Sequence, residues 1–589
     1  MKQGVVGESL ASVYYYLTPG DKRQFILMLV LLLISSLLEV FGLASLVPII
    51  MAASRPGTIN QNKYTAWIYN LAGFENEKTF LLFAILLILL FFVAKNIFTT
   101  WVNYKQVSFS TKVALQIIED QFKKFTSLPY WDFINVGSSI FTHHILNIPQ
   151  QFVTIVIRQL FVLLSEIFIV AIIIVAILFY QPFLFLLLVL VLVPSTLLTY
   201  RLLRQRSQYV GARLDKLRPV PYAILSDMFA GFTELTLANK KHKFKERLNI
   251  NQEEFQKLEG RSYLYSLIPL KVIEMVAIFA ISTIFIYSLF FTENPANVIT
   301  IIGAFAAAAY RLMPSVNRII SSLVALKQSE IVRKELERYR KETFPQLLSA
   351  NKQPLLFTQD ITFKNISFSF PSSDTPVINN ISFQVKKGEK IGFIGTSGSG
   401  KTTLMNVLLR FYPEESGNIL VDGIPLSGAN LLAWYQLIGY VKQDTFLMEA
   451  SIQDNITLHD DNPDEERLKY AIEQASLSHF VNSLPEGVNT RIGERGSRLS
   501  GGQRQRIGIA RALYKKTEIM ILDEATSALD NETEHEVNES INRLSHTAIT
   551  LFIIAHRLTT LRYCDRIYEL KEGEIIAEHQ YADIIADLH

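Results

Sequence analysis

The chain has 589 residues, of which 49% are hydrophobic and 19% are charged, whereas a typical soluble protein carries about 25% charged residues. Its 57 Lys and Arg residues are nearly balanced by 54 Asp and Glu residues, and the net charge of +3 gives no support to nucleic-acid binding through overall basicity. A single cysteine, Cys564, excludes both an intrachain disulfide and a metal site built from several cysteines.

The hydrophobic residues are unevenly distributed along the chain. Residues 1–330 contain nearly all the long apolar runs, whereas residues 355–589 have the mixture of charged, apolar and turn residues found in soluble α/β domains. We therefore predict a transmembrane domain with long cytoplasmic helical extensions at residues 1–330, a linker at residues 331–354 and a soluble domain at residues 355–589.

Six segments of the first domain are predicted to cross a bilayer, whose core needs about 20 apolar residues per helix. Residues 167–200 carry no charge, and as a single helix they would be roughly 51 Å long at about 1.5 Å per residue. This stretch is therefore predicted to form two spans that are separated at Gln181 and Pro182. Three of the other predicted spans lie within residues 24–54, 79–101 and 298–326. The remaining one has Lys271 and Glu274 in its first half, and its uncharged part is residues 275–292.

Lysine and arginine are concentrated in two of the predicted loops. Residues 201–261 carry thirteen of them, and the loop between the second and third spans carries Lys105, Lys112, Lys123 and Lys124. Because cytoplasmic loops carry the excess of positive charge, both loops and both termini are predicted to face the cytosol.

One segment of the longest external loop has a helical pattern of aromatic and apolar residues. Tyr64, Trp67, Ile68 and Leu71 recur at i, i+3, i+4 and i+7, and Gly73 follows as a stop signal. Such a face suits the headgroup boundary of a membrane. It would equally pack against the transmembrane helices of the same chain, and the pattern does not decide between the two.

Charged side chains also occur inside the predicted spans, where each is costly if it faces lipid. They are Lys95, Arg158, Lys271, Glu274 and Arg311. A cavity with this basic lining would bind an anionic group such as phosphate or pyrophosphate. Alternatively, the basic side chains extend to the membrane surface, and Lys271 and Glu274, one helical turn apart, form an internal pair.

A short apolar strand at Lys390–Ile394 runs directly into a glycine-rich sequence. Residues 395–402 match the P-loop pattern G-x-x-x-x-G-K-[ST], whose backbone N–H groups surround phosphate oxygens at a helix N-terminus. Lys401 is predicted to reach the β- and γ-phosphates of ATP, and Thr402 to bind Mg²⁺. The predicted nucleotide-binding residues of this loop are Gly395, Thr396, Ser397, Gly398, Ser399, Gly400, Lys401, Thr402 and Thr403.

A second apolar strand, at residues 519–522, ends in two carboxylates, Asp523 and Glu524. In parallel α/β sheets, ligands bind at the carboxyl ends of the strands, so both side chains are expected beside the P-loop. A P-loop enzyme needs one acid for the metal ion and one group that orients water. We predict that Asp523 is the Mg²⁺ partner and that Glu524 polarises the attacking water.

A third motif lies between these two, and with it residues 355–589 as a whole resemble the ATPase domain of ABC transporters. The signature residues of that family are Ser500, Gly501, Gly502 and Gln503. The resemblance implies that Phe370 stacks on adenine, although the family more usually has tyrosine there. It further implies that Gln443 takes part in metal binding and catalysis, and that His556 is a second catalytic side chain.

The same resemblance implies ATP and Mg²⁺ as cofactors and a head-to-tail dimer of two ATPase domains. In this dimer, the signature residues of one domain contact the ATP that is bound to the P-loop of the other domain. A homodimer with two competent sites is the simplest assembly, and a heterodimer with a degenerate partner stays open. Six spans fused ahead of the ATPase domain are similar to the ABC exporter arrangement. The predicted fold is thus an α-helical membrane domain of exporter type fused to an α/β P-loop ATPase domain, with coupling helices near residues 129–137 and 228–236.

In residues 38–42, in residues 310–318 and in the external helix, the membrane domain resembles PglK-type flippases of polyprenyl-pyrophosphate-linked oligosaccharides. The resemblance implies that the protein lies in the cytoplasmic (inner) membrane of a bacterium. Its expected partners are membrane lipid and an anionic lipid-linked glycan, and no nucleic acid is expected. Export of a peptide, drug or other lipid is the alternative within transport, and a membrane-anchored regulator or channel is a third hypothesis. The substrate residues that the resemblance implies are Lys95, Lys271 and Arg311 for the pyrophosphate and Tyr64, Trp67 and Leu71 for the polyprenyl tail.

Overall fold

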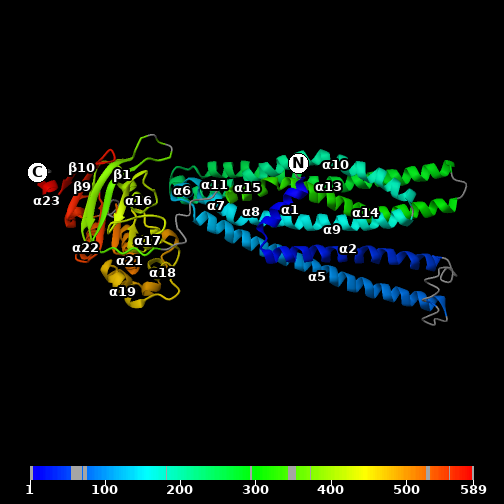
Figure 1. The fold of residues 1–589 in the computed structure, drawn as a ribbon, viewed down its shortest axis with the longest axis horizontal. Helices are drawn as coiled ribbons and strands as arrows, with labels where there is room; N and C mark the ends of the chain where they lie inside the picture. Colours follow the sequence, from blue (N-terminus) through cyan, green and yellow to red (C-terminus); the bar gives the residue numbers. More distant parts are fainter. Residues whose placement is uncertain are drawn as a thin grey trace. The chain divides into compact units, whose positions relative to one another are not determined.

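The computed structural model describes residues 4–54, 69, 76–180, 182–291, 295–341, 353–371, 373, 375–524, 531–555 and 557–586. The chain divides into two compact units (Figure 1). The first unit consists of Met1–Thr126 and Val136–Thr343, and the second of Ser127–Asn135 and Phe344–His589. Nine residues from the helical half of the sequence thus belong to the second unit.

Long helices make up most of the first unit. Three of them begin at proline, which lacks the N–H that would be unpaired there and already has a helical φ. The long helices are α2 (Pro19–Ser54), α5 (Glu77–Thr126), α9 (Arg158–Tyr180), α10 (Pro182–Leu217), α13 (Lys241–Phe291) and α14 (Pro295–Gln328). Shorter ones include α1 (Val5–Tyr16), α11 (Val220–Ala230), α12 (Phe232–Leu237) and α15 (Glu330–Lys341).

Helix α14 is the central packing element of the first unit, because α9, α10 and α13 all pack against it. Helix α2 packs against α5 and α9. At that junction the ring centroid of Phe161 lies 5.5 Å from that of Phe25 and 6.0 Å from that of Phe109. The buried Asp21 carboxylate at the start of α2 accepts a hydrogen bond of 2.6 Å from Lys112 Nζ, which links α2 to α5.

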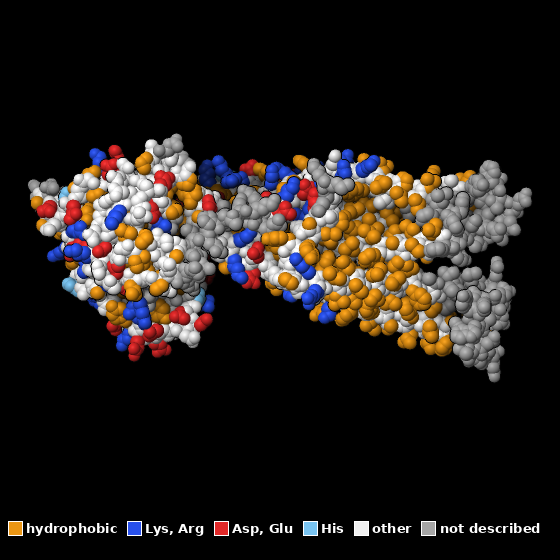
Figure 2. Space-filling model, in the orientation of Figure 1, with side chains coloured by type: hydrophobic (Ala, Val, Ile, Leu, Met, Phe, Trp, Pro, Cys, Tyr) orange, Lys and Arg blue, Asp and Glu red, His pale blue; other side chains and the backbone are white. Residues whose placement is uncertain are grey.

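Among the described residues, four helical segments are long and apolar enough to cross a membrane: Pro19–Gly42, Lys78–Thr126, Ile140–Leu178 and Lys241–Phe279. The helical unit presents a broad apolar surface (Figure 2). On α5, Leu82 and Leu90 are each 70% exposed, which fits contact with lipid or another chain rather than water. The count of six spans stays a prediction, and Tyr64, Trp67 and Leu71 of the predicted external helix lie outside the described residues.

The second unit contains a mostly parallel sheet in the strand order β10, β9, β3, β8, β7, β6, with β10 antiparallel at one edge. A smaller antiparallel sheet has the order β2, β1, β4, β5. Strands β7 and β8 are buried at every position, as expected when both faces of a sheet are covered. The strands are β1 (Asp360–Phe368), β2 (Ile378–Lys386), β3 (Lys390–Ile394), β4 (Ser416–Val421), β5 (Ile424–Pro425), β6 (Ile438–Val441), β7 (Ile519–Asp523), β8 (Thr550–Ile554), β9 (Arg566–Lys571) and β10 (Glu574–His579).

The helix α6 (Tyr130–Val136) lies where the sequence predicts the first coupling helix, and its residues up to 135 belong to the second unit. The ring of Tyr130 stacks on Phe411, with centroids 4.6 Å apart and an interplanar angle of 25°. The ring of Trp131 stacks on Phe370 at 5.2 Å and 27°. A segment that follows α5 in the sequence is therefore packed against the hydrophobic core of the second unit.

Candidate functional site

The P-loop connects β3 to α16 (Lys401–Leu408) through glycines that adopt backbone conformations unfavourable for other residues. Gly395 has φ +145° and Gly400 has φ +101°. A Cβ atom on Gly395 would lie 2.2 Å from the carbonyl oxygen of Leu570. The chain can therefore pass close to the end of β9 and turn into α16 only with glycine at this position.

The side chain of Lys401 is buried within this loop. Its Nζ donates hydrogen bonds of 2.9 Å to the carbonyl oxygens of Gly395 and Thr396, and a third of 3.4 Å to Ser399 Oγ. Burial lowers the pKa of Lys401, whereas the nearby carboxylates of Glu524 and Asp523 raise it. The loop thus holds a cation at the N-terminus of α16, where the helix dipole and free N–H groups also favour an anion.

Thr402 and Asp523 meet beside the P-loop, as the carboxyl ends of β3 and β7 require. Thr402 Oγ1 lies 3.5 Å from Asp523 Oδ1, and the phenol of Tyr440 donates a 2.9 Å hydrogen bond to Asp523 Oδ2. Burial and the charge of Glu524 raise the pKa of Asp523, and the hydrogen bonds from Tyr440 and Thr402 act in the opposite direction. Burial and the adjacent Asp523 also raise the pKa of Tyr440, which keeps its hydroxyl a donor at neutral pH.

The residues present fit Mg²⁺. The Thr402 hydroxyl and the Asp523 carboxylate are hard oxygen ligands, and their separation of 3.5 Å lets one cation contact both. Within the part of the chain that the structure describes, no group of three or more His, Cys, Asp or Glu side chains is arranged to hold a metal ion. One hydroxyl and one carboxylate beside a phosphate site is the arrangement that Mg²⁺ uses when nucleotide phosphates and water supply the other ligands.

Glu524 follows β7 with φ +52°, a left-handed conformation that is unusual for a residue other than glycine. Its N–H donates a 3.0 Å hydrogen bond to the carbonyl oxygen of Ile554 at the end of β8. This bond fixes the residue at the edge of the sheet next to Asp523. The predicted catalytic carboxylate therefore occupies a strained backbone position that the neighbouring strand holds in place.

The signature residues form the first turn of α21 (Gly501–Tyr514). Ser500 Oγ accepts a 3.2 Å hydrogen bond from the N–H of Gln503, and Gln503 Oε1 accepts a 2.9 Å bond from the N–H of Ser500. This capping box fixes the start of the helix, and Gly501 and Gly502 bring no bulky side chain to it. The exposed N-terminus of α21 can therefore accept an anion.

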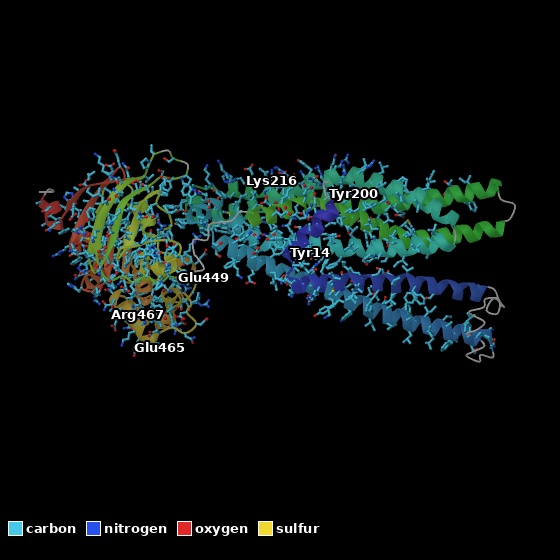
Figure 3. The ribbon with its side chains drawn as sticks, viewed as in Figure 1. Tyr14, Tyr200, Lys216, Glu449, Glu465 and Arg467 are labelled. Carbon is cyan, nitrogen blue, oxygen red and sulfur yellow. The ribbon has the colours of Figure 1, made fainter. Side chains whose placement is uncertain are left out.

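The other end of α21 is held by Arg467 of α19 (Glu465–Gln474), which is labelled in Figure 3. Arg467 Nη2 donates a 2.5 Å hydrogen bond to the carbonyl oxygen of Leu513, and Nε donates one of 3.4 Å to that of Tyr514. A cation on the last carbonyl groups complements the helix dipole. Both ends of the signature helix are thus capped by side chains.

Gln443, the predicted metal and catalytic residue, lies in an exposed loop after β6. Sequence reasoning missed Gln505, a buried residue of α21 that holds this loop. Gln505 Nε2 donates to the carbonyl oxygens of Gln443 and of Lys442, the latter at 3.0 Å, and Gln505 Oε1 accepts a 3.0 Å bond from Thr445 Oγ1. Little in the sequence signals this role, because α21 carries several other polar side chains, among them Gln503, Arg504 and Arg506.

Phe370, the predicted adenine-stacking residue, has one ring face covered by Trp131 of α6. The edges of Phe368 and Tyr412 contact it at centroid distances of 5.3 and 5.6 Å. The predicted stacking of a base on this ring would have to use a face that Trp131 does not cover. His556, the other predicted catalytic residue, lies outside the described residues.

In the helical unit, Lys271 Nζ pairs with Glu274 Oε2 at 3.0 Å, and Lys95 Nζ lies 4.9 Å from the ring centroid of Phe92. The side chain of Arg311 is outside the described part of the structure. Sequence reasoning missed Glu166, whose side chain is only 4% exposed and whose Oε1 lies 2.5 Å from Arg318 Nη1. An internal Lys271–Glu274 pair is present, as one of the two alternatives for these charges requires.

The comparisons with known proteins agree with this architecture. Residues 378–527 match the sequence profile of the family described as "ABC transporter". The chain is 44% identical over 226 residues to the "Leukotoxin translocation ATP-binding protein LktB" of Mannheimia glucosida, covering 38% of this chain and 32% of that protein. It is also 44% identical over 229 residues to an "ATP-dependent lipid A-core flippase" of Syntrophus aciditrophicus (strain SB), covering 39% of this chain and 38% of the flippase.

The chain thus matches between 32% and 38% of the length of these two relatives. A solved structure matches nearly all of this chain. It is the ATP-bound structure of a bacterial Atm1-family ABC exporter, with a TM-score of 0.77 and 20% sequence identity. That match covers 97% of this chain and 96% of the other. The chain therefore has the fold of an ABC exporter, an α-helical membrane-type region joined to an α/β ATPase domain of the ABC type.

Proposed function

We propose that the chain is an ATP hydrolase that drives a substrate across a bacterial cytoplasmic membrane, with its ATPase domain in the cytosol. The observation that carries this proposal is the meeting of Lys401, Thr402 and Asp523 at the carboxyl ends of β3 and β7. Membrane-type helices in the same chain supply the transport part of the proposal. The names of the two relatives described above refer to a flippase and a translocation protein, which favours transport over a regulator or channel.

In this mechanism, Lys401 and the N–H groups of the P-loop hold the ATP phosphates, and Thr402 and Asp523 hold Mg²⁺. Mg²⁺, when bound, neutralises charge that develops on the phosphates. Glu524 takes a proton from the attacking water or orients it, and Gln443 and His556 complete this set of polar groups. Ser500 of a second copy binds the γ-phosphate from the opposite side, so hydrolysis requires a homodimer.

For the substrate we propose a polyprenyl-pyrophosphate-linked oligosaccharide. Lys95, Lys271 and Arg311 supply cations for the pyrophosphate, and Tyr64, Trp67 and Leu71 supply an apolar face for the lipid tail. One relative is named a lipid A-core flippase, and that name is consistent with a lipid as the transported molecule. Export of a peptide, drug or other lipid is the second candidate, because the leukotoxin translocation proteins match at the same level of identity.

The test uses purified protein in sealed vesicles that contain a labelled polyprenyl-pyrophosphate-linked oligosaccharide, with ATP hydrolysis assayed in parallel. We expect ATP-dependent movement of the labelled lipid and stimulation of ATPase activity by this lipid more than by a peptide. Lys271→Ala and Arg311→Ala should reduce translocation far more than basal ATPase activity. Arg311→Lys should be milder than Arg311→Ala, because an ammonium still attracts phosphate without the bidentate geometry.

The matched control is Lys257→Ala, because Lys257 is also an exposed lysine of α13 that pairs with a glutamate on its own helix, at 2.5 Å. It should leave both activities unchanged. If Lys271→Ala and Arg311→Ala translocate the lipid as well as wild type does, the pyrophosphate proposal is wrong. Stimulation by peptide instead of lipid would favour the general exporter.

A further inference from the structure

Asp523 is held on both oxygens by side chains of the same domain. Oδ1 lies 3.5 Å from the hydroxyl of Thr402, on the side of the predicted Mg²⁺ site. Oδ2 accepts a 2.9 Å hydrogen bond from the phenol of Tyr440. One oxygen is therefore directed toward the metal site while the other is occupied by a neutral donor.

The strand register explains why Tyr440 reaches this carboxylate. β6 pairs with β7 in parallel, and Tyr440 lies beside Ile521, two residues before Asp523. A tyrosine ring spans that offset, since its hydroxyl lies well beyond Cβ. The ring is partly buried against the core that includes β3 and β7, so its direction is fixed by packing.

Lys442 lies close to both the ring of Tyr440 and the ring of Tyr130 in α6. Lys442 Nζ lies 5.5 Å from the ring centroid of Tyr440 and 5.8 Å from that of Tyr130 in α6. Both distances are within the range of a cation–π contact. The phenol that holds Asp523 is thus two contacts away from a residue of the helix α6.

We propose that Tyr440 is a positioning residue of the metal site, which orients the Asp523 carboxylate so that Oδ1 faces Mg²⁺. This inference rests on the proposed ATPase function of the same site. Side chains that hydrogen-bond a metal ligand set its orientation, and their loss typically weakens metal binding by about 10–100-fold. Lys442 contacts the rings of both Tyr440 and Tyr130, so α6 is connected to the Asp523 carboxylate through Lys442 and Tyr440.

The test is the binding of Mn²⁺, used in place of Mg²⁺, to the full-length protein saturated with a non-hydrolysable ATP analogue. Free Mn²⁺ is measured by electron paramagnetic resonance, so the readout does not depend on turnover. Tyr440→Phe removes only the hydroxyl, and we expect it to weaken Mn²⁺ binding by about tenfold or more. Binding of the analogue without metal and the thermal unfolding temperature should stay close to wild type.

The matched control is Tyr514→Phe, because the Tyr514 phenol also donates to an aspartate, Asp460 Oδ2, at 3.1 Å, on a surface loop. It should leave Mn²⁺ affinity unchanged. In an Asp523→Ala background, Tyr440→Phe should have no further effect on Mn²⁺, because the group through which it acts is missing. An additional loss in that background would show that Tyr440 acts by another route and would overturn the inference.

The two proposals fail in different ways. If wild-type protein bound neither the ATP analogue nor Mn²⁺ with it, the proposed ATPase function itself would be wrong. If wild type binds both and Tyr440→Phe has the same Mn²⁺ affinity as wild type, only the positioning role of Tyr440 is wrong.

Discussion

Glu524 has a backbone conformation that is uncommon for a residue other than glycine. A non-glycine residue in the left-handed region costs about 1–3 kcal/mol, and Glu524 retains φ +52° although asparagine or glycine would fit more easily. The bond from its N–H to Ile554 holds this conformation. Such strain persists at functional sites, where it aims a side chain at its target.

We predict that Glu524→Gln lowers the rate of ATP hydrolysis by about 10²–10⁴-fold, the usual contribution of a positioned acid or base. Nucleotide binding should persist, because glutamine keeps the shape of the side chain and removes a negative charge near the phosphates. Steady-state hydrolysis and equilibrium binding of labelled ATP measure the two effects. Glu572→Gln is the control, since Glu572 is an exposed glutamate that also has positive φ, at +49°. Near-normal hydrolysis by Glu524→Gln would refute the catalytic assignment.

A second residue-scale prediction concerns the pair between Glu166 and Arg318. Glu166 is almost fully buried in α9, whereas the Arg318 side chain is 53% exposed. Arg318→Ala leaves the buried carboxylate without its cation, which destabilises the fold because an unpaired charge stays buried. We expect a lower unfolding temperature for Arg318→Ala in detergent and substantial recovery in the double variant Arg318→Ala, Glu166→Gln. Equal destabilisation of the single and double variants would mean that the pair contributes little.

At the scale of elements, the sequence was informative wherever one local pattern determines the backbone. The P-loop strand, turn and helix followed from the spacing of Gly395, Gly400 and Lys401, because only glycine tolerates the φ values there. The stacking of Trp131 on Phe370 was not predictable, since it joins residues 239 positions apart. Glu166 and Arg318, 152 positions apart, escaped notice for the same reason.

Helix α6 is short, but Tyr130 and Trp131 pack against the hydrophobic core of the second unit. Aromatic pairs contribute about 0.5–1.5 kcal/mol each beyond the area they bury. We predict that Tyr130→Ala with Trp131→Ala abolishes stimulation of ATPase activity by transported lipid, while basal hydrolysis falls by a few-fold at most. Some loss of the basal rate is expected, because Trp131 packs on Phe370 and Tyr130 lies 5.8 Å from Lys442 Nζ. The hydrogen bonds of the P-loop lysine and of Asp523 involve neither residue, so most of the basal rate should persist.

The control for this helix is Ile134→Ala, because Ile134 is 50% exposed on the same helix. It should behave as wild type in both assays. Lipid-stimulated hydrolysis that survives in the double aromatic variant would exclude α6 as the element that couples the two activities.

At the scale of the whole molecule, the two helix N-termini of the ATPase-type domain are the basis of the proposed homodimer. The P-loop occupies the start of α16, and the signature residues occupy the start of α21, so each helix N-terminus is a separate anion site. A single ATP held by Lys401 leaves the Ser500 site unused within its own domain. Two copies arranged head to tail bring each unused site to the phosphates of the other copy.

The homodimer is tested by placing one defect on each of two differently tagged chains. Lys401→Ala weakens the phosphate grip of one P-loop, and Ser500→Arg blocks one signature helix. In the mixed dimer, both defects fall on the same composite site, and the other site combines an intact P-loop with an intact Ser500. Each homodimer of a single variant, in contrast, carries a defect at both sites. We therefore expect about one tight ATP per mixed dimer after tandem affinity purification, and weak binding by either variant alone. If each site used residues of its own chain only, both chains of the mixed dimer would be defective and no tight site would be expected. No tight site, or two equivalent tight sites, would therefore contradict the head-to-tail arrangement.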